Sequence, residues 1–125
     1  MNKINYQKLT DKIIDGLGSN TPKLLLHSCC APCSSYTLEY LSQYFEITVL
    51  YYNPNISPYD EFEKRFSEQK RLIESLPSKH KITLIKGDYR YEEFEQIAKG
   101  YENIAEGGER CFRCYRLRLE KTARL

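Results

Sequence analysis

A chain of 125 residues suits one compact domain with its own hydrophobic core. Hydrophobic residues make up 41% of it and charged residues 29%, which is ordinary for a soluble globular protein. No apolar run approaches the roughly 20 residues that span a bilayer, and residues 1–8 lack the apolar segment of a secretory signal. We therefore predict a single cytoplasmic domain over residues 1–125 without membrane contact. The net charge of +2 indicates no class of partner.

Hydrophobic spacing predicts helices and strands in alternation. In chain order the predicted elements are a helix over residues 2–18, a strand over 23–28, a helix from Pro32 to Tyr44, a strand over 46–52, a helix over 59–76, a strand over 81–86, a helix over 91–99, and a final helix from about Arg113 onward. The pattern predicts an α/β fold in which right-handed crossovers build a parallel sheet with helices on both faces.

The turns that follow the predicted strands carry most of the side chains with useful chemistry. Cys29 and Cys30 follow the first strand, residues 53–55 follow the second, and residues 88–89 follow the third. Ligands of parallel sheets bind beyond the carboxyl ends of the strands. We therefore expect the three turns to face one crevice.

Five cysteines form two groups that lie far apart in the sequence, Cys29, Cys30 and Cys33 in the first and Cys111 and Cys114 in the second. In a cytoplasmic protein, clustered cysteines more often bind metal or do redox work than form structural disulfides. Soft sulfur donors select zinc, Cu(I) or iron–sulfur clusters. The CCxxC spacing departs from the paired CxxC of zinc knuckles and favours a cluster, although zinc stays open. Inert buried cysteines are the structural alternative.

Several other side chains have both a structural and a functional interpretation. We expect His27, inside a strand, to be hydrogen-bonded in the core rather than bound to metal. Tyr51, Tyr52 and Tyr59 are either core and rim aromatics or a platform for an RNA base. Residues 110–125 carry six basic side chains against one acidic one, which is typical of a phosphate-binding stripe or of a solvated helix face.

Three motifs together resemble the QueH type of epoxyqueuosine reductase. They are LHSCCAPC at residues 26–33, YYNPNISPYDEFEKR at 51–65 and ERCFRCYRLRLE at 109–120. They run in the family's order over residues from about 23 to 125. The resemblance implies a fold related to the adenine-nucleotide α-hydrolase (HUP) group and a 4Fe-4S cluster. It also implies two-electron reduction of the epoxide of epoxyqueuosine in the anticodon loop of tRNA, giving queuosine.

By position, the resemblance assigns Cys29, Cys30, Cys111 and Cys114 as ligands of the cluster. Cys33 lies where family members carry Cys or Asp, and this position could serve a second, single metal ion, iron or zinc, acting as a Lewis acid on the epoxide oxygen. Family members continue further, with a redox-active cysteine pair in their tail, so we expect this chain to be truncated at its C-terminal end. The electron donor is unknown.

The expected chemistry also needs a proton donor, and Asp88 and Tyr89 are the candidates because both follow the third predicted strand. The alternative for Asp88 is a turn residue or the N-cap of the helix that starts at Tyr91.

Two other functions stay open. One is a zinc-stabilised RNA-binding module without catalysis. The other is an ATP-using α-hydrolase-fold enzyme, which is disfavoured because residues 28–33 contain no glycine to wrap a phosphate.

Overall fold

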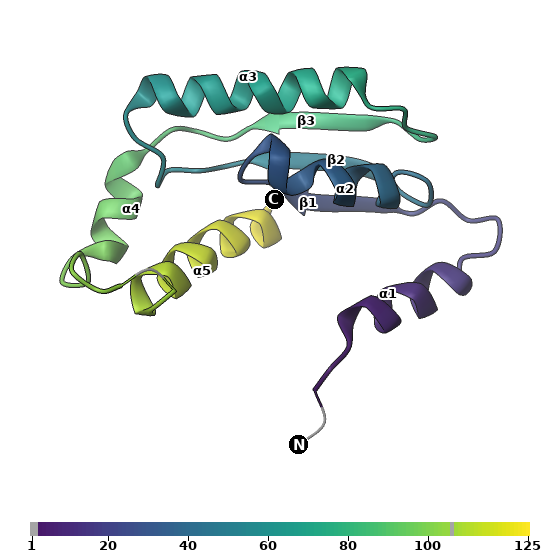
Figure 1. Cartoon of the computed structure of the whole chain (residues 1–125), viewed down its shortest axis with the longest axis horizontal. Coiled ribbons are helices and arrows are strands. Elements are labelled where there is room, and N and C mark those ends of the chain that lie inside the picture. Colours follow the sequence, from purple (N-terminus) through teal and green to yellow (C-terminus); the bar gives the residue numbers. More distant parts are fainter. Residues whose placement is uncertain (1–2, 106) are drawn as a thin grey trace.

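The computed structural model describes residues 3–105 and 107–125, which form a three-stranded sheet and five helices (Figure 1). The helices are α1 (Tyr6–Asp15), α2 (Ala31–Leu41), α3 (Tyr59–Ser75), α4 (Tyr91–Ala98) and α5 (Glu109–Arg124), and the strands are β1 (Lys23–His27), β2 (Glu46–Tyr51) and β3 (Ile82–Lys86). The strands are parallel in the order β1-β2-β3. The predicted α/β fold with a parallel sheet is therefore confirmed.

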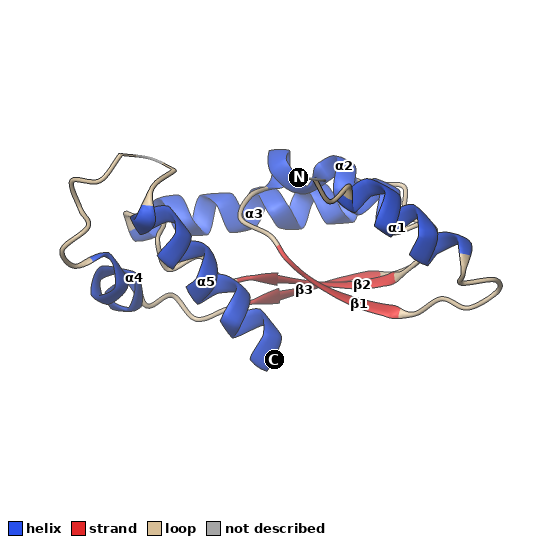
Figure 2. Ribbon diagram, turned by 90° about the horizontal axis from the view of Figure 1, so that it is seen from below, coloured by secondary structure: helices blue, strands red, loops and turns tan. Residues whose placement is uncertain are grey.

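The strand order explains where the helices lie. Because each crossover advances the sheet in the same direction, right-handed connections place α2 and α3 on one face, where α1 also lies (Figure 2). Helix α5 packs against β1, and its C-terminal end lies on the opposite side of the sheet (Figure 2). Helices thus occupy both sides, as predicted, but the second face is incompletely covered, since Leu25 and Ile85 each keep 37% of their surface exposed.

The core lies between the sheet and the helices of the first face. Alternating residues of β2, Ile47 and Val49, are fully buried there against Leu38 of α2. A second cluster, Tyr51 with Ile56 and Phe62, lies at the carboxyl end of β2. The core therefore extends to the end of the sheet at which ligands of such folds bind.

Three predicted helices have a boundary that differs from the structure by more than one residue. The second helix ends at Leu41 rather than Tyr44. The first helix is shorter than predicted, because the side chain of Asn5 caps it by accepting a hydrogen bond from the Lys8 N–H at 3.0 Å; residue 2 of the predicted helix lies outside the described residues. The last helix starts at Glu109 rather than near Arg113, because Gly108 takes the extended N-cap conformation. Both cysteines of the second group consequently lie inside α5.

None of the helices in the described residues combines the length and hydrophobicity that crossing a bilayer requires. The kinship with the HUP group stays a prediction, as does the single domain over residues 1–125.

Candidate metal centre

The segment from Ser28 to Ser34, here called the cysteine turn, connects β1 to α2. Cys30 is the N-cap of α2, in an extended conformation, and Cys33 lies in the first helical turn. Residues three apart at a helix start lie on the same side, so the two side chains can approach one another. The sulfurs of Cys29, Cys30 and Cys33 all lie within 4.8 Å of one another. The distance from Cys29 Sγ to Cys30 Sγ is 3.7 Å.

Proximity of the three thiols changes their acidity. Burial acts to raise the pKa of Cys30, but hydrogen bonds from the side chain and backbone of Cys33 outweigh it, and the pKa is lowered overall. The pKa of Cys33 is raised to about 11, mainly by its hydrogen bond to Cys30 and then by the charges of Cys29 and Cys30. The three thiols therefore differ in acidity, with Cys30 more acidic and Cys33 less acidic than an ordinary cysteine.

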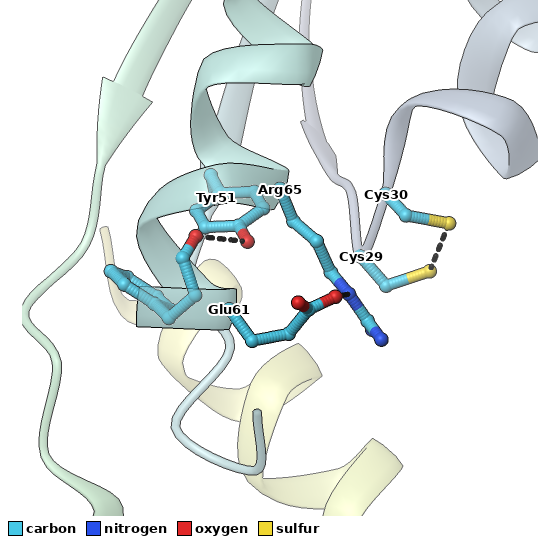
Figure 3. A network of polar contacts seen from close by, with 6 residues as sticks. Cys29, Cys30, Tyr51, Glu61 and Arg65 are labelled. Carbon is cyan, nitrogen blue, oxygen red and sulfur yellow. Dashed lines mark hydrogen bonds and ion pairs between the residues drawn. The ribbon is translucent and has the colours of Figure 1, made fainter. Parts of the chain in front are cut away.

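A cationic side chain lies beside the turn. Arg65 extends from α3 toward Cys29 and Cys30 (Figure 3), and its Nε donates to Glu61 Oε1 at 2.8 Å. Its charge also lowers the pKa of Cys30, as a smaller contribution than the hydrogen bonds from Cys33. Nearby, the hydroxyl of the buried Tyr51 donates to the Phe62 carbonyl at 3.0 Å.

Hydrogen bonds join the ends of the three strands. His27 Nε2 bonds to the Tyr52 carbonyl at 2.7 Å, and since a carbonyl only accepts, Nε2 carries the proton. The Gly87 N–H donates to the Tyr51 carbonyl at 2.7 Å. Asn53 Nδ2 donates to the Ser28 carbonyl at 3.1 Å. The ends of the three strands therefore lie side by side, whereas a single crevice shared by the three turns stays a prediction. His27 is a hydrogen-bonded residue as expected. Burial lowers its pKa, an effect that its bond to Tyr52 partly offsets.

The second cysteine pair occupies the first two turns of α5. Cys111 Sγ accepts a hydrogen bond from the Gly107 N–H at 3.3 Å, and Cys114 keeps only 5% of its surface exposed. Burial raises the pKa of Cys114, and the charge of Arg118 one turn later partly opposes this. Within the described residues, the group of converging sulfurs contains the first three cysteines only. A site shared by both groups stays a prediction.

One loop contacts both cysteine groups. Asn53 is fully buried; its amide nitrogen bonds to Ser28, and its Oδ1 accepts from Arg118 Nη1 at 3.4 Å. Asn55 lines a cavity of about 300 Å³ together with Cys111 and Cys114. A separate cavity of about 210 Å³ is lined by Cys29 and Cys33. The loop after β2 therefore lies next to both groups.

The cavity beside α5 contains polar atoms with no partner. Asn55 Oδ1 and Arg118 Nε are buried without a hydrogen bond in the part of the chain that the structure describes. Because an unpaired buried polar atom costs free energy, such atoms indicate a place where a bound group or ordered water completes the site. The same cavity is lined by Cys111 and Cys114, whose sulfurs are the kind of ligand that thiophilic metals prefer.

The two predicted proton donors are in different environments. Asp88 is exposed and has no hydrogen bond within the described residues. It is not the N-cap of α4, a position that Arg90 occupies. The hydroxyl of Tyr89 donates to the Ile56 carbonyl at 2.7 Å, and its ring packs 4.6 Å from that of Phe62. Of the two groups, Asp88 is the one that is free to reach a substrate.

The aromatic and basic candidates divide between core and surface. Tyr51 and Tyr52 are fully buried, which favours the core interpretation, whereas Tyr59 is 51% exposed at the rim. In the basic stripe, Arg113 stacks on the Tyr101 ring at 4.6 Å and Arg118 faces Asn53. Three further basic residues of the stripe are exposed: Arg116, Lys121 and Arg124. The stripe is thus partly inward-facing.

Sequence reasoning missed one buried residue at this site. Gln69 of α3 is fully buried and hydrogen-bonds both Ser28 and Ser34, on the two sides of the cysteines. The sequence did contain a signal for it. Gln69 lies three residues after Phe66 and four before Ile73, so it occupies a position on the apolar face of the predicted helix.

Comparison with known proteins identifies the family. The model of the family described as "Epoxyqueuosine reductase QueH" matches residues 24–125. The chain belongs to the QueH family. Curated proteins of that name include one from Staphylococcus epidermidis, 42% identical over 98% of this chain and 54% of the relative. Another, from Streptococcus pyogenes serotype M1, is 38% identical over 97% of this chain and 49% of the relative. A third, from Helicobacter pylori, is 42% identical over 80% of this chain and 27% of the relative. The chain spans about half the length of the first two.

Proposed function

We propose that this chain is part of an enzyme that reduces the epoxide of epoxyqueuosine in the anticodon loop of tRNA, giving queuosine. The observation that carries the proposal is the convergence of three cysteine sulfurs beyond the end of β1 in a chain of the QueH family. The name of the family's curated relatives supplies the reaction. tRNA is then the partner, and the cytoplasm, where tRNA is modified, is the location.

The proposed cofactor is a 4Fe-4S cluster held by Cys29, Cys30, Cys111 and Cys114. Contact of the loop after β2 with both cysteine groups supports a shared site, because Asn53 bonds the cysteine turn and α5 at once. When bound, such a cluster supplies electrons one at a time, at a potential set by its ligands, hydrogen bonds and exposure. Cys33 is proposed to serve a second, single metal ion, iron or zinc, that acts as a Lewis acid.

The chain's own residues would supply the rest of the site. Conversion of the epoxide to the alkene breaks both C–O bonds, takes up two electrons and two protons and releases water. The electrons come from a donor outside this chain. We propose that Asp88 delivers a proton, since it is exposed at the carboxyl end of β3 whereas the hydroxyl proton of Tyr89 is committed to Ile56.

An Asp88→Asn substitution tests this role. Loss of a general acid lowers turnover by about 10²–10⁴-fold, so we expect a decrease of at least about 100-fold in queuosine formed from epoxyqueuosine-containing tRNA. Asp60→Asn is the matched control, because Asp60 is another exposed aspartate, in the first turn of α3. Full turnover of the Asp88→Asn protein would remove Asp88 from the mechanism.

The proposal of a cluster is tested by anaerobic purification. A brown protein with broad visible absorption and near-stoichiometric iron and sulfide is the expected result. A colourless protein that holds zinc would instead indicate the zinc-stabilised RNA-binding module. Binding of labelled ATP by a metal-free protein would indicate the ATP-using enzyme.

A further inference from the structure

The buried amide of Gln69 is the most unusual polar group outside the cysteines. It has no exposed surface, although its helix is otherwise covered by apolar side chains on this face, Phe62 and Phe66 before it and Leu72 after it. Burying an amide without hydrogen bonds costs on the order of 1–3 kcal/mol, so a position like this one is normally apolar. A buried amide at this position therefore indicates that the hydrogen bonds of Gln69 have a structural or functional role.

The partners of the amide lie on both sides of the cysteines. Ser28 Oγ donates to Gln69 Oε1 at 2.7 Å, and Gln69 Nε2 donates to Ser34 Oγ at 3.2 Å. Ser34 Oγ in turn lies 3.3 Å from the Ala31 carbonyl, in the middle of the turn. The contacts join residues 41 and 35 positions apart in the sequence. A single side chain of α3 thus fixes where the cysteine turn begins and where it ends.

We propose that Gln69 is the positioning residue of the cysteine turn, which holds Cys29, Cys30 and Cys33 in the arrangement that binds metal. In the described residues its hydrogen bonds go to Ser28 and Ser34 and not to a sulfur, so it acts through the two serines. The proposal rests on the proposed function, because it assumes that these cysteines bind a metal. Removing residues that orient metal ligands through hydrogen bonds typically weakens metal binding by about 10–100-fold. We expect a loss of metal affinity of this size when the hydrogen bonds of Gln69 are removed.

Gln69→Met separates positioning from folding. Methionine keeps the unbranched shape and a similar helix propensity but can neither donate nor accept these bonds. Both serine hydroxyls retain a backbone acceptor at 3.3 Å, Cys30 O for Ser28 and Ala31 O for Ser34, so neither becomes an unpaired buried group. We therefore expect a thermal midpoint close to that of the unchanged chain. The matched control is Leu72→Ala, which alters the same helix next to the core but not the turn.

The first measurement is titration of the reduced 125-residue chain with Co²⁺, followed by the thiolate-to-cobalt charge-transfer absorption. We expect Gln69→Met to weaken Co²⁺ binding by about 10–100-fold. Leu72→Ala should lower the thermal midpoint and leave the cobalt affinity unchanged. Equal cobalt affinity and equal spectra for Gln69→Met and the unchanged chain would overturn the proposal.

The second measurement needs no metal. The Ser34 amide donates to the Cys30 carbonyl at 3.3 Å, so its hydrogen exchange reports the order of the cysteine turn. Faster exchange at Ser34 in Gln69→Met, but not in Leu72→Ala, is expected, and unchanged protection would contradict the proposal. If the unchanged chain gives no thiolate–cobalt absorption, the proposed metal function fails, and the exchange result still decides the role of Gln69. Should Gln69→Met not fold, Ser34→Ala tests the same hydrogen bonds from α2.

Discussion

The two cysteine groups of this protein are supported in different ways. The cysteine turn is bonded to its surroundings at several points, through Gln69 of α3, through Asn53 and through the N-terminus of α2. In the described residues, the pair on α5 is linked to the sheet end by the 3.4 Å hydrogen bond of Arg118 with Asn53 and by Lys121, which lies over the Tyr52 ring. Beside that pair, α5 exposes Phe112 (60%) and Leu119 (62%). The turn is organised by the sheet, whereas the second pair depends on how one helix is held.

Substituting cysteines in each group gives the largest expected effect and tests whether the two groups act together. Cys30→Ser and Cys114→Ser should each lose nearly all iron after anaerobic reconstitution, because a shared 4Fe-4S cluster needs ligands from both groups. Cys33→Ser is the control, since it removes only the proposed single metal ion. Iron and sulfide analysis measures the outcome. If only Cys30→Ser loses iron, the turn binds metal alone and the second pair is independent of it.

A substitution at Gly87 tests how closely the ends of β2 and β3 pack, because Tyr51 and Tyr52 lie close to the backbone of Gly87. A Cβ added at Gly87 would lie 2.9 Å from Tyr52 Cβ and 3.1 Å from the Tyr51 carbonyl oxygen. We expect Gly87→Ala to lower the free energy of unfolding by about 1–3 kcal/mol, measured by urea denaturation. In the control Gly16→Ala, the nearest atoms are 3.5 and 3.6 Å away, so stability should stay unchanged or rise slightly. Equal stabilities of the two variants would argue against close packing at the sheet end.

Arg118→Met should loosen the second pair alone, and this is the smallest of the three effects. Its hydrogen bond to Asn53 is long, and losing about 1 kcal/mol corresponds to about a fivefold rise in local opening. Hydrogen exchange of the Cys114 amide, followed by mass spectrometry, should speed up by about that factor while exchange of the Ser34 amide in the cysteine turn does not. Arg116→Met, on the exposed side of α5, is the control. An unchanged rate at Cys114 would mean that other contacts hold α5.

Local sequence patterns predicted much of the fold and part of the candidate site. The β-branched and aromatic run at residues 46–52 predicted β2 to within one residue, and the CCxxC spacing with Pro32 predicted a helix start that carries cysteines. The start of α5 was placed too late because the N-cap conformation of Gly108, which has no side chain to mark a cap, decides it. Gln69 was missed because its two serine partners belong to segments distant in the sequence.

The amino-acid sequence by itself determined the order of elements, the parallel α/β fold and the presence of cysteines at the start of two helices, because these follow from hydrophobic spacing and turn chemistry over a few residues. Only the tertiary structure decided which buried amides anchor the turns and that Asn53 bonds both Ser28 and Arg118. Such contacts depend on strand register and on how the helices cross the sheet, and local periodicity does not specify either of them.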